Sequence, residues 1–348
     1  MDLMDIPAPA AASRQVGAGH VALSPRQLIM FYSPDEWEEF TYEWLSGVAG
    51  NYKSVKKFAG AGDQGVDIAG FLSEDGFEGE WDCFQCKHYA GAVGWSDIFP
   101  ELLKIFHHVA EADYVLPSKY VIVAPREVTT SLQQLLNTAT QMRDKFLATL
   151  TEGYAGRANY QKIYDVAAAA NFNIFRSAQM DEVLDDHRST PHHSFRFGTA
   201  LPARDEPELP PVDLQANESI YIRQLLAVYS ERHSASYSAE SAADDELTST
   251  HFRKQRIRFF RAESLEKYAR DSVPAGTYQA FKEDIYNGVI DVALDDHDSG
   301  YARLSKVLSA AGQINLASHL LATRAEQDDI KGVCHQLANR ELLTWVQT

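Results

Sequence analysis

The chain reads Gly-Asp-Gln-Gly-Val-Asp-Ile at residues 62–68 and Gln-Cys-Lys at residues 85–87, and these two stretches decide the fold. Each belongs to a short segment that predicts a β-strand, the first over residues 66–72 and the second over residues 80–88. An Asp-Gly pair between the two segments favours a tight turn, so we expect an antiparallel hairpin.

The hairpin gathers polar side chains on one face. Side chains alternate along a strand, so Gln85 and Lys87 point to the same face, and a plausible register places Asp67 opposite them. Glu38 lies on a helix that precedes the strands and could reach the same place. Glu39 is its rival, because only one of two adjacent residues can face the site.

This combination suits phosphodiester hydrolysis with Mg²⁺ or Mn²⁺. Mg²⁺ prefers oxygen ligands and usually takes one or two carboxylates, waters and substrate phosphate. Asp67 and Glu38 would supply carboxylates. Gln85 and the backbone carbonyl of Cys86 would supply two further oxygen atoms. The metal would activate a bound water, and Lys87 would orient that water or stabilise the developing charge.

The surrounding elements complete an α/β domain. A Ser-Pro-Asp-Glu run at residues 33–36 is typical of a helix start, with a serine cap and proline in the first turn. A nearly all-apolar run at residues 119–124 predicts a strand that is buried on both faces. The remaining elements expected here are a strand over residues 52–58, helices over residues 96–110, 131–149 and 160–169, and a short strand over residues 172–175.

The rest of the chain has a different composition. Residues 201–216 contain four prolines among charged residues, which is typical of a linker. Beyond them we expect helices near residues 217–237, 246–271, 274–292, 299–310, 313–322 and 326–339. The sequence thus predicts a disordered tail (1–24), an α/β domain (25–200), a linker (201–216) and an all-α domain (217–348).

Composition and charge exclude several classes of protein. The 348 residues include 32 Lys and Arg against 49 Asp and Glu, which gives a formal net charge of −17. This excludes a protein that holds nucleic acid by bulk positive charge. No apolar run is long enough to cross a bilayer, no secretory signal is recognisable, and there are only three cysteines. We therefore expect a cytoplasmic protein without a membrane partner.

Two local basic stretches are candidates for DNA contact. The first is a His-rich segment with Arg188 and Arg196, whose alternative is a loop that packs back on the α/β core. The second contains Arg253, Lys254 and Arg256. Its alternative is an ordinary helix face that pairs with nearby acids such as Glu263 and Glu266.

Cys83 and Cys86 form a Cys-x-x-Cys pair, which raises the question of a zinc site. Residues three apart in a strand point to opposite faces, so both sulfurs could not easily hold one ion. No second Cys pair or Cys-His cluster completes four ligands. We therefore expect both cysteines to be packing residues.

The helix glutamate, Gly-Asp-Gln-Gly-Val-Asp and Gln-Cys-Lys together resemble the motifs of the Mrr-like branch of the PD-(D/E)XK nucleases, in which Gln replaces the usual acid of the last motif. The resemblance implies a restriction-endonuclease-like fold, with a mixed central sheet flanked by helices. It implies that Asp67 binds the metal, that Gln85 and Lys87 form the last motif, and that Glu38 is the helix glutamate. Asp63 and Glu39 would lie just behind these residues.

The C-terminal region resembles the helical C-terminal domain of ABC-three-component effectors, the nuclease subunits of Lamassu-type bacterial antiphage systems. The stretches that carry this resemblance are residues 261–265, 268–271, 295–297 and especially Gly-Val-Cys-His-Gln-Leu-Ala-Asn at residues 332–339. It implies partnership with an SMC-like ABC ATPase and a small accessory subunit. An all-helical domain of this kind also suits docking, and if cutting both DNA strands requires two active sites, its self-association would make the active protein a homo-oligomer.

Three functions follow as hypotheses. The first is a metal-dependent endonuclease for double-stranded DNA, the effector of a bacterial antiphage complex. The second is a stand-alone Mrr-like restriction enzyme for modified DNA, with the C-terminal domain as the reader. The third is a non-catalytic scaffold that binds DNA and recruits an ATPase.

Overall fold

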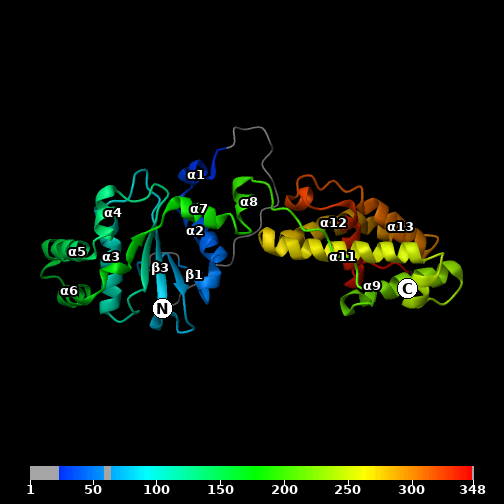
Figure 1. Cartoon of the computed structure of the whole chain (residues 1–348), viewed down its shortest axis with the longest axis horizontal. Coiled ribbons are helices and arrows are strands. Elements are labelled where there is room, and N and C mark those ends of the chain that lie inside the picture. The colour runs from blue at the N-terminus through cyan, green and yellow to red at the C-terminus, as the bar shows by residue number, and fades with distance from the viewer. Residues whose placement is uncertain (1–22, 59–63, 347–348) are drawn as a thin grey trace. The chain divides into compact units, whose positions relative to one another are not determined.

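The structure, a computed structural model, describes residues 23–58 and 64–346 and divides them into two compact units. The described residues up to His193 form an α/β unit, and those from Ser194 onward form a helical unit (Figure 1). Each unit buries its own hydrophobic core. The expected mixed sheet with helices and the expected all-helical C-terminal region are both confirmed.

A five-stranded mixed sheet forms the centre of the α/β unit, with the strand order β1-β2-β3-β4-β5. The first three strands are antiparallel, and β4 and β5 join in parallel. β2 and β3 pair antiparallel as expected, and a longer connection with a 3₁₀ turn at Gly76–Glu78 joins them in place of a tight turn; both strands are buried along their whole length. The strands are β1 (Ser54–Lys57), β2 (Ile68–Phe71), β3 (Trp81–Cys86), β4 (Lys119–Val123) and β5 (Phe175–Ser177).

Helices cover both faces of this sheet (Figure 1). α2 packs on one face, where the indole of the fully buried Trp37 donates to the backbone carbonyl of Val123 over 3.0 Å. α3 packs on the other face, with α5 and α6 behind it. The helices are α1 (Pro25–Leu28), α2 (Pro34–Gly47), α3 (Trp95–Ala110), α4 (Thr130–Leu136), α5 (Ala139–Tyr154), α6 (Tyr160–Ala169) and α7 (Met180–His187).

α2 begins where the sequence predicts. The Ser33 hydroxyl accepts from the backbone N–H of Glu36, and the Glu36 carboxylate accepts from the backbone N–H of Ser33. This reciprocal cap satisfies two N–H groups that would otherwise lack helical partners. It fixes the start of the helix that carries Glu38 and Glu39.

Two expectations in the α/β unit are wrong in detail. The helix expected over residues 131–149 is broken, because the non-helical backbone of Thr138 (φ −134°, ψ 79°) separates α4 from α5. The strand expected over residues 172–175 is a 3₁₀ turn at Phe172–Ile174, which the side chain of Asn171 caps. β5 begins only at Phe175.

The helical unit is built around α11, which packs along α14. A Cβ atom at Gly332 would lie 1.9 Å from the backbone carbonyl oxygen of Arg258, so only glycine allows these two helices to approach so closely. The helix expected over residues 313–322 is only a 3₁₀ turn at Leu320–Thr323. The helices are α8 (His193–Phe197), α9 (Ser219–His233), α10 (Ala239–Asp244), α11 (Ser249–Ser272), α12 (Thr277–Leu294), α13 (Gly300–Ala311) and α14 (Gln327–Asn339).

The Pro-rich segment expected as a linker is bound to the helical unit. Leu201 belongs to the core of that unit. The Arg204 guanidinium pairs with the fully buried Asp329 over 2.8 Å and donates to the backbone carbonyl of Arg261. Farther along, Arg256 donates to the carbonyls of Val212 and Asp213. The segment therefore contributes to the packing of the helices.

Candidate active site

The carboxylate of Asp67 lies at the end of the β2–β3 hairpin. β2 and β3 pair Ile68 with Phe84, and the same register continued by one step places Asp67 opposite Gln85. One oxygen, Oδ2, accepts from the Gln85 side-chain amide over 2.6 Å and from the backbone N–H of Cys86 over 2.7 Å. Asp67 is 9% exposed and Gln85 only 2%. The structure thus brings together the two residues that the sequence placed on one face.

A second hydrogen bond fixes the orientation of the Gln85 amide. Its oxygen accepts from the Tyr120 hydroxyl over 3.1 Å. Burial raises the pKa of Tyr120 well above its usual range, and the nearby charges of Glu101 and Asp67 raise it further, so the hydroxyl stays protonated. Gln85 therefore presents N–H to Asp67 and its oxygen to Tyr120.

Lys87 points to the same face and contacts an acid on α3. Its Nζ lies 2.8 Å from Oε1 of Glu101, and each of the two side chains is 12% exposed. Burial opposes the charge of Lys87, but the hydrogen bond and the negative charge of Glu101 outweigh it and raise the pKa of the ammonium. For Glu101, bonds to Lys104 and Lys87 outweigh burial and lower the pKa of the carboxyl. Both groups therefore remain charged at neutral pH.

Sequence reasoning missed Glu101, although its spacing carries a signal. Ile98, Leu102 and Ile105 form the buried stripe of α3, and Glu101 falls within the same stripe at helical spacing. An acid on the buried face of a helix needs a charged partner. That requirement could have indicated that Glu101 faces the sheet beside a cation.

Glu38 approaches from the other side of the sheet. Its carboxylate lies 3.3 Å from Nζ of Lys57, and Lys57 pairs with Ile68 across β1 and β2. Because Ile68 follows Asp67 directly, the two point to opposite faces. Glu38 therefore lies on the α2 face, whereas Asp67, Gln85 and Lys87 lie on the α3 face.

Glu39 and Asp63 are the other residues that the sequence placed near this cluster. Glu39 is half-buried on α2 next to Glu38, and Asp63 lies outside the described residues. Among the residues that the structure describes, no three His, Cys, Asp or Glu side chains are arranged to hold a metal ion by themselves.

The two cysteines of β3 are buried free thiols, as packing residues would be. Burial raises the pKa of both thiols well above the usual range, and the charge of Asp67 raises it further. Cys83 belongs to the core on the α3 face, whereas Cys86 points to the α2 face. Neither thiol is a plausible nucleophile or zinc ligand here.

The prediction that Arg256 contacts DNA is wrong, because this side chain is buried. Its guanidinium pairs with the fully buried Glu218 over 2.6 Å. Lys254 pairs with Asp328 over 3.3 Å, whereas Arg253 is exposed on α11. The alternative of a basic helix face that pairs with acids describes most of this stretch, although its partners are not the acids we expected.

The His-rich segment packs back on α2, as its alternative interpretation predicted. Glu43, buried on α2, lies 3.3 Å from Nε2 of His187 and 3.6 Å from Nδ1 of His192. His187 Nδ1 lies 3.0 Å from His193 Nδ1. Burial, together with the charge of His187, lowers the pKa of His193 to about 4. Arg188 remains exposed beside Asp185, and Arg196 is half-buried.

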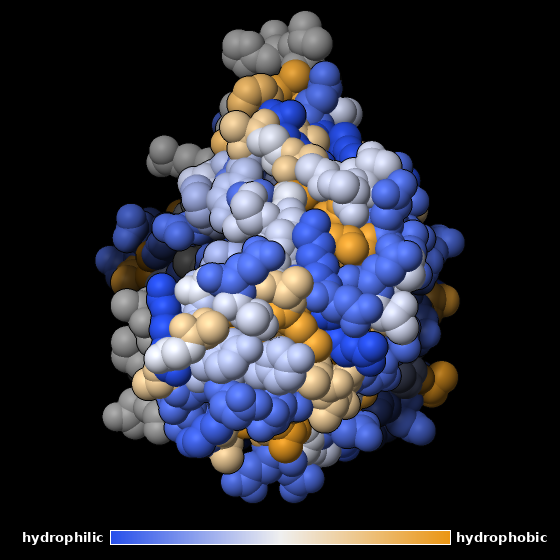
Figure 2. Space-filling view, turned by 90° about the vertical axis from the view of Figure 1, so that its left-hand side faces the viewer, coloured by the Kyte–Doolittle hydropathy of each residue, from blue (hydrophilic) through white to orange (hydrophobic). Residues whose placement is uncertain are grey.

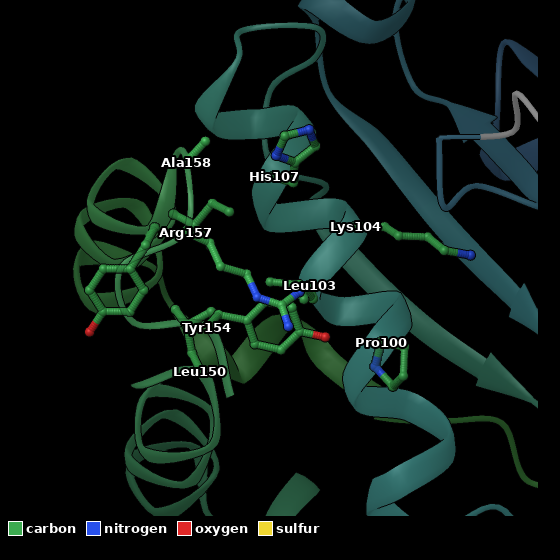
Figure 3. A pocket seen from close by; sticks show the side chains of 10 residues that line it. Pro100, Leu103, Lys104, His107, Leu150, Tyr154, Arg157 and Ala158 are labelled. Carbon is green, nitrogen blue, oxygen red and sulfur yellow. The ribbon is translucent and has the colours of Figure 1, made fainter. Parts of the chain in front are cut away.

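The outer side of α3 carries a cavity between α3, α5 and α6, shown in Figure 3. The guanidinium of Arg157 lies 4.4 Å from the ring of Tyr154 at this cavity. Lys104 contributes only its stem and extends away from the cavity. Figure 2 shows that the surface on this side of the α/β unit is mainly hydrophilic, with small separate hydrophobic areas. None of the predicted catalytic residues lines the cavity.

No helix in the described part of the chain is long and apolar enough to cross a bilayer. No curated protein and no solved structure was found to match the chain. Residues 218–345, however, match the family described as C-terminal domain 6 of the ABC-three component (ABC-3C) systems, and this match supports membership of the chain in such a system.

Proposed function

We propose that this chain is a Mg²⁺- or Mn²⁺-dependent endonuclease for double-stranded DNA and acts as the effector of an ABC-three-component antiphage system. The observation that carries the proposal is the meeting of Asp67, Gln85 and Lys87 on one face of the sheet, where Asp67 and Gln85 are 2.6 Å apart. The order helix, three strands, helix, strand from α2 to β4 also agrees with a PD-(D/E)XK nuclease domain.

The donor atoms present suit a hard divalent cation. Asp67 and Glu101 offer carboxylate oxygens, and the thiols nearby stay protonated. Mg²⁺ usually keeps several waters and takes only one or two carboxylates with substrate phosphate, so a set of three protein acids is not required. When bound, the cation would activate a water for attack on phosphorus.

The residues of this chain would organise that attack. Asp67 is held in place by the Cys86 N–H and the Gln85 amide, so its second oxygen, Oδ1, has a fixed direction. Lys87 is charged and largely shielded from solvent. An ammonium in such surroundings can orient a water and stabilise negative charge on the phosphate.

The match of residues 218–345 supports the second half of the proposal. We propose that the helical unit docks on an SMC-like ABC ATPase and a small accessory subunit, as in Lamassu-type systems. These partners would hold the nuclease inactive until foreign DNA is sensed. Release would allow the chain to self-associate, so that two sites cut both strands.

Cleavage of supercoiled plasmid by the purified full chain in Mg²⁺ or Mn²⁺ tests the nuclease. We expect nicked and linear products that EDTA abolishes, and no products from a folded Lys87→Ala protein. A matched control is Lys162→Ala, which removes an exposed lysine of α6 that pairs with Glu111 at the surface. Undiminished cutting by Lys87→Ala would refute this site.

The same experiment separates the alternatives. A stand-alone restriction enzyme would cut methylated plasmid only and would need no partner. A scaffold would retard DNA in a gel in the presence of EDTA and cut under no metal. Co-purification from the native host tests the partnership, and we expect an SMC-like ATPase with the chain.

A further inference from the structure

We infer that Glu101 is the second carboxylate of the metal site, and that Lys87 occupies the place of the cation until a divalent ion enters. The inference rests on the proposed nuclease function. It names a ligand on α3 that replaces the acid missing from β3.

The first argument is that Gln85 is already committed. Its N–H is donated to Asp67 and its oxygen accepts from Tyr120, with both bonds buried. To offer its oxygen to a cation beside Asp67, the amide would have to turn over and give up its bond to Oδ2. Leaving a buried polar group unsatisfied costs about 1–3 kcal/mol. A second carboxylate beside Asp67 would therefore complete the site at less cost than the Gln85 amide.

The second argument is the position of Glu101. Asp67 accepts from Gln85 over 2.6 Å, and Lys87, two residues farther along on the same face, lies 2.8 Å from Glu101, so the two carboxylates contact neighbouring side chains of one strand face. Lys87 lies within the influence of both: it is 2.8 Å from Glu101, and Asp67 is among the charges that raise its pKa.

The third argument is that two cations hold one carboxylate. Lys104 Nζ lies 2.8 Å from Oε2 of Glu101, while Lys87 contacts Oε1. Figure 3 shows Lys104 extending from α3 away from the neighbouring cavity. Lys104 is half-exposed and can keep Glu101 in place when Lys87 leaves. A carboxylate that exchanges one ammonium for a divalent ion would free Lys87 to orient the attacking water.

Mn²⁺ binding to the full chain, measured by isothermal titration calorimetry, tests the inference without reference to cleavage. Glu101→Gln keeps the size of the side chain and should weaken Mn²⁺ binding by about ten-fold or more. Glu111→Gln removes a carboxylate that lies at the surface beyond the end of the same helix and should bind Mn²⁺ like the wild type. Lys87→Met removes the competing ammonium and should tighten binding.

A double variant separates a ligand from a mere counter-ion. If Glu101 only neutralises Lys87, Glu101→Gln should have no effect on Mn²⁺ binding in the Lys87→Met background. If Glu101 is a ligand, the loss should persist there. Wild-type binding that Asp67→Asn abolishes and Glu101→Gln leaves unchanged would overturn this inference but not the nuclease. A wild-type chain that neither binds Mn²⁺ nor cuts DNA would overturn both.

Discussion

Gln85 donates its side-chain amide to Oδ2 of the buried Asp67 over 2.6 Å, and the same oxygen accepts the backbone N–H of Cys86. A neutral glutamine thus holds a buried carboxylate where an acid would repel it. Both buried N–H groups at the end of the hairpin thereby have a charged acceptor. Asp67 therefore has two roles: its negative charge would bind a cation, and its Oδ2 accepts two hydrogen bonds that stabilise the fold.

Substitutions of Asp67 should distinguish these two roles. The oxygen of Asp67→Asn can take the position of Oδ2 and accept both hydrogen bonds, so the fold should lose little stability. Asp67→Ala leaves two buried N–H groups unsatisfied, and the free energy of unfolding should fall by about 2–3 kcal/mol. Urea unfolding at pH 7 measures the difference. Both variants should fail to cut DNA, and equal stability of the two would contradict the assigned hydrogen bonds.

Gln85→Glu should make stability depend on pH and metal. Two carboxylates would then meet, so the pair would retain a proton and its pKa would rise above that in the unfolded chain. The folded variant binds more protons, so its unfolding free energy should decrease as pH rises from about 4 to 8. Mg²⁺ should restore part of the loss. Gln141→Glu, on the exposed surface of α5, is the control and should show neither effect.

Arg256→Ala should unfold the helical unit without revealing a DNA contact. It would leave the fully buried Glu218 without its guanidinium partner, and breaking such a pair typically costs about 3–5 kcal/mol. Arg253→Ala, on the exposed side of the same helix, should change stability by less than about 0.5 kcal/mol. Thermal melts followed by circular dichroism make the comparison. A stable Arg256→Ala protein with weakened DNA binding would reverse this conclusion.

The helical unit should lose stability as pH falls below 6.5. Burial, aided by Arg258, lowers the pKa of His335 to about 3 and that of His251 to about 4. Between 6.5 and these values the unfolded chain binds protons that the folded chain does not, so stability is fully present above 6.5 and falls through this window. His335→Gln keeps a donor for Gln255 and cannot be protonated there. Its melting temperature should therefore fall less steeply between pH 6.5 and 4.

Local sequence patterns predicted the structure correctly where contacts between residues close in the chain determine it. The Ser33 and Glu36 cap defines the start of α2, and strand alternation predicts that Asp67 and Gln85 share a face. The buried stripe of α3 indicates only that Glu101 needs a charged partner; that this partner is Lys87 depends on tertiary packing, which no local pattern states. Glu38 was placed too close to Asp67, since a sequence does not show which face of a sheet a helix covers.

The contacts of the Pro-rich segment could not be predicted from the sequence for a similar reason. Its proline-rich, charged composition favours an extended chain without tertiary contacts. Arg204, however, pairs with the buried Asp329, which lies 125 residues farther along the sequence. Likewise, the partners of Arg256 and Lys254 come from other elements, Glu218 and Asp328. The sequence shows where basic residues cluster, but tertiary contacts determine which of them are exposed to solvent and which are paired with acids.

The anchoring of residues 201–213 has a practical consequence for dissecting the protein. A fragment cut at residue 218, where the family match begins, would strip Leu201 from the core and leave Asp329 with Arg261, at 3.6 Å, as its cationic partner in place of Arg204. The smallest piece able to fold by itself should therefore start near Ser194. Chimaeras that exchange the helical unit between related chains should be joined there, upstream of the prolines.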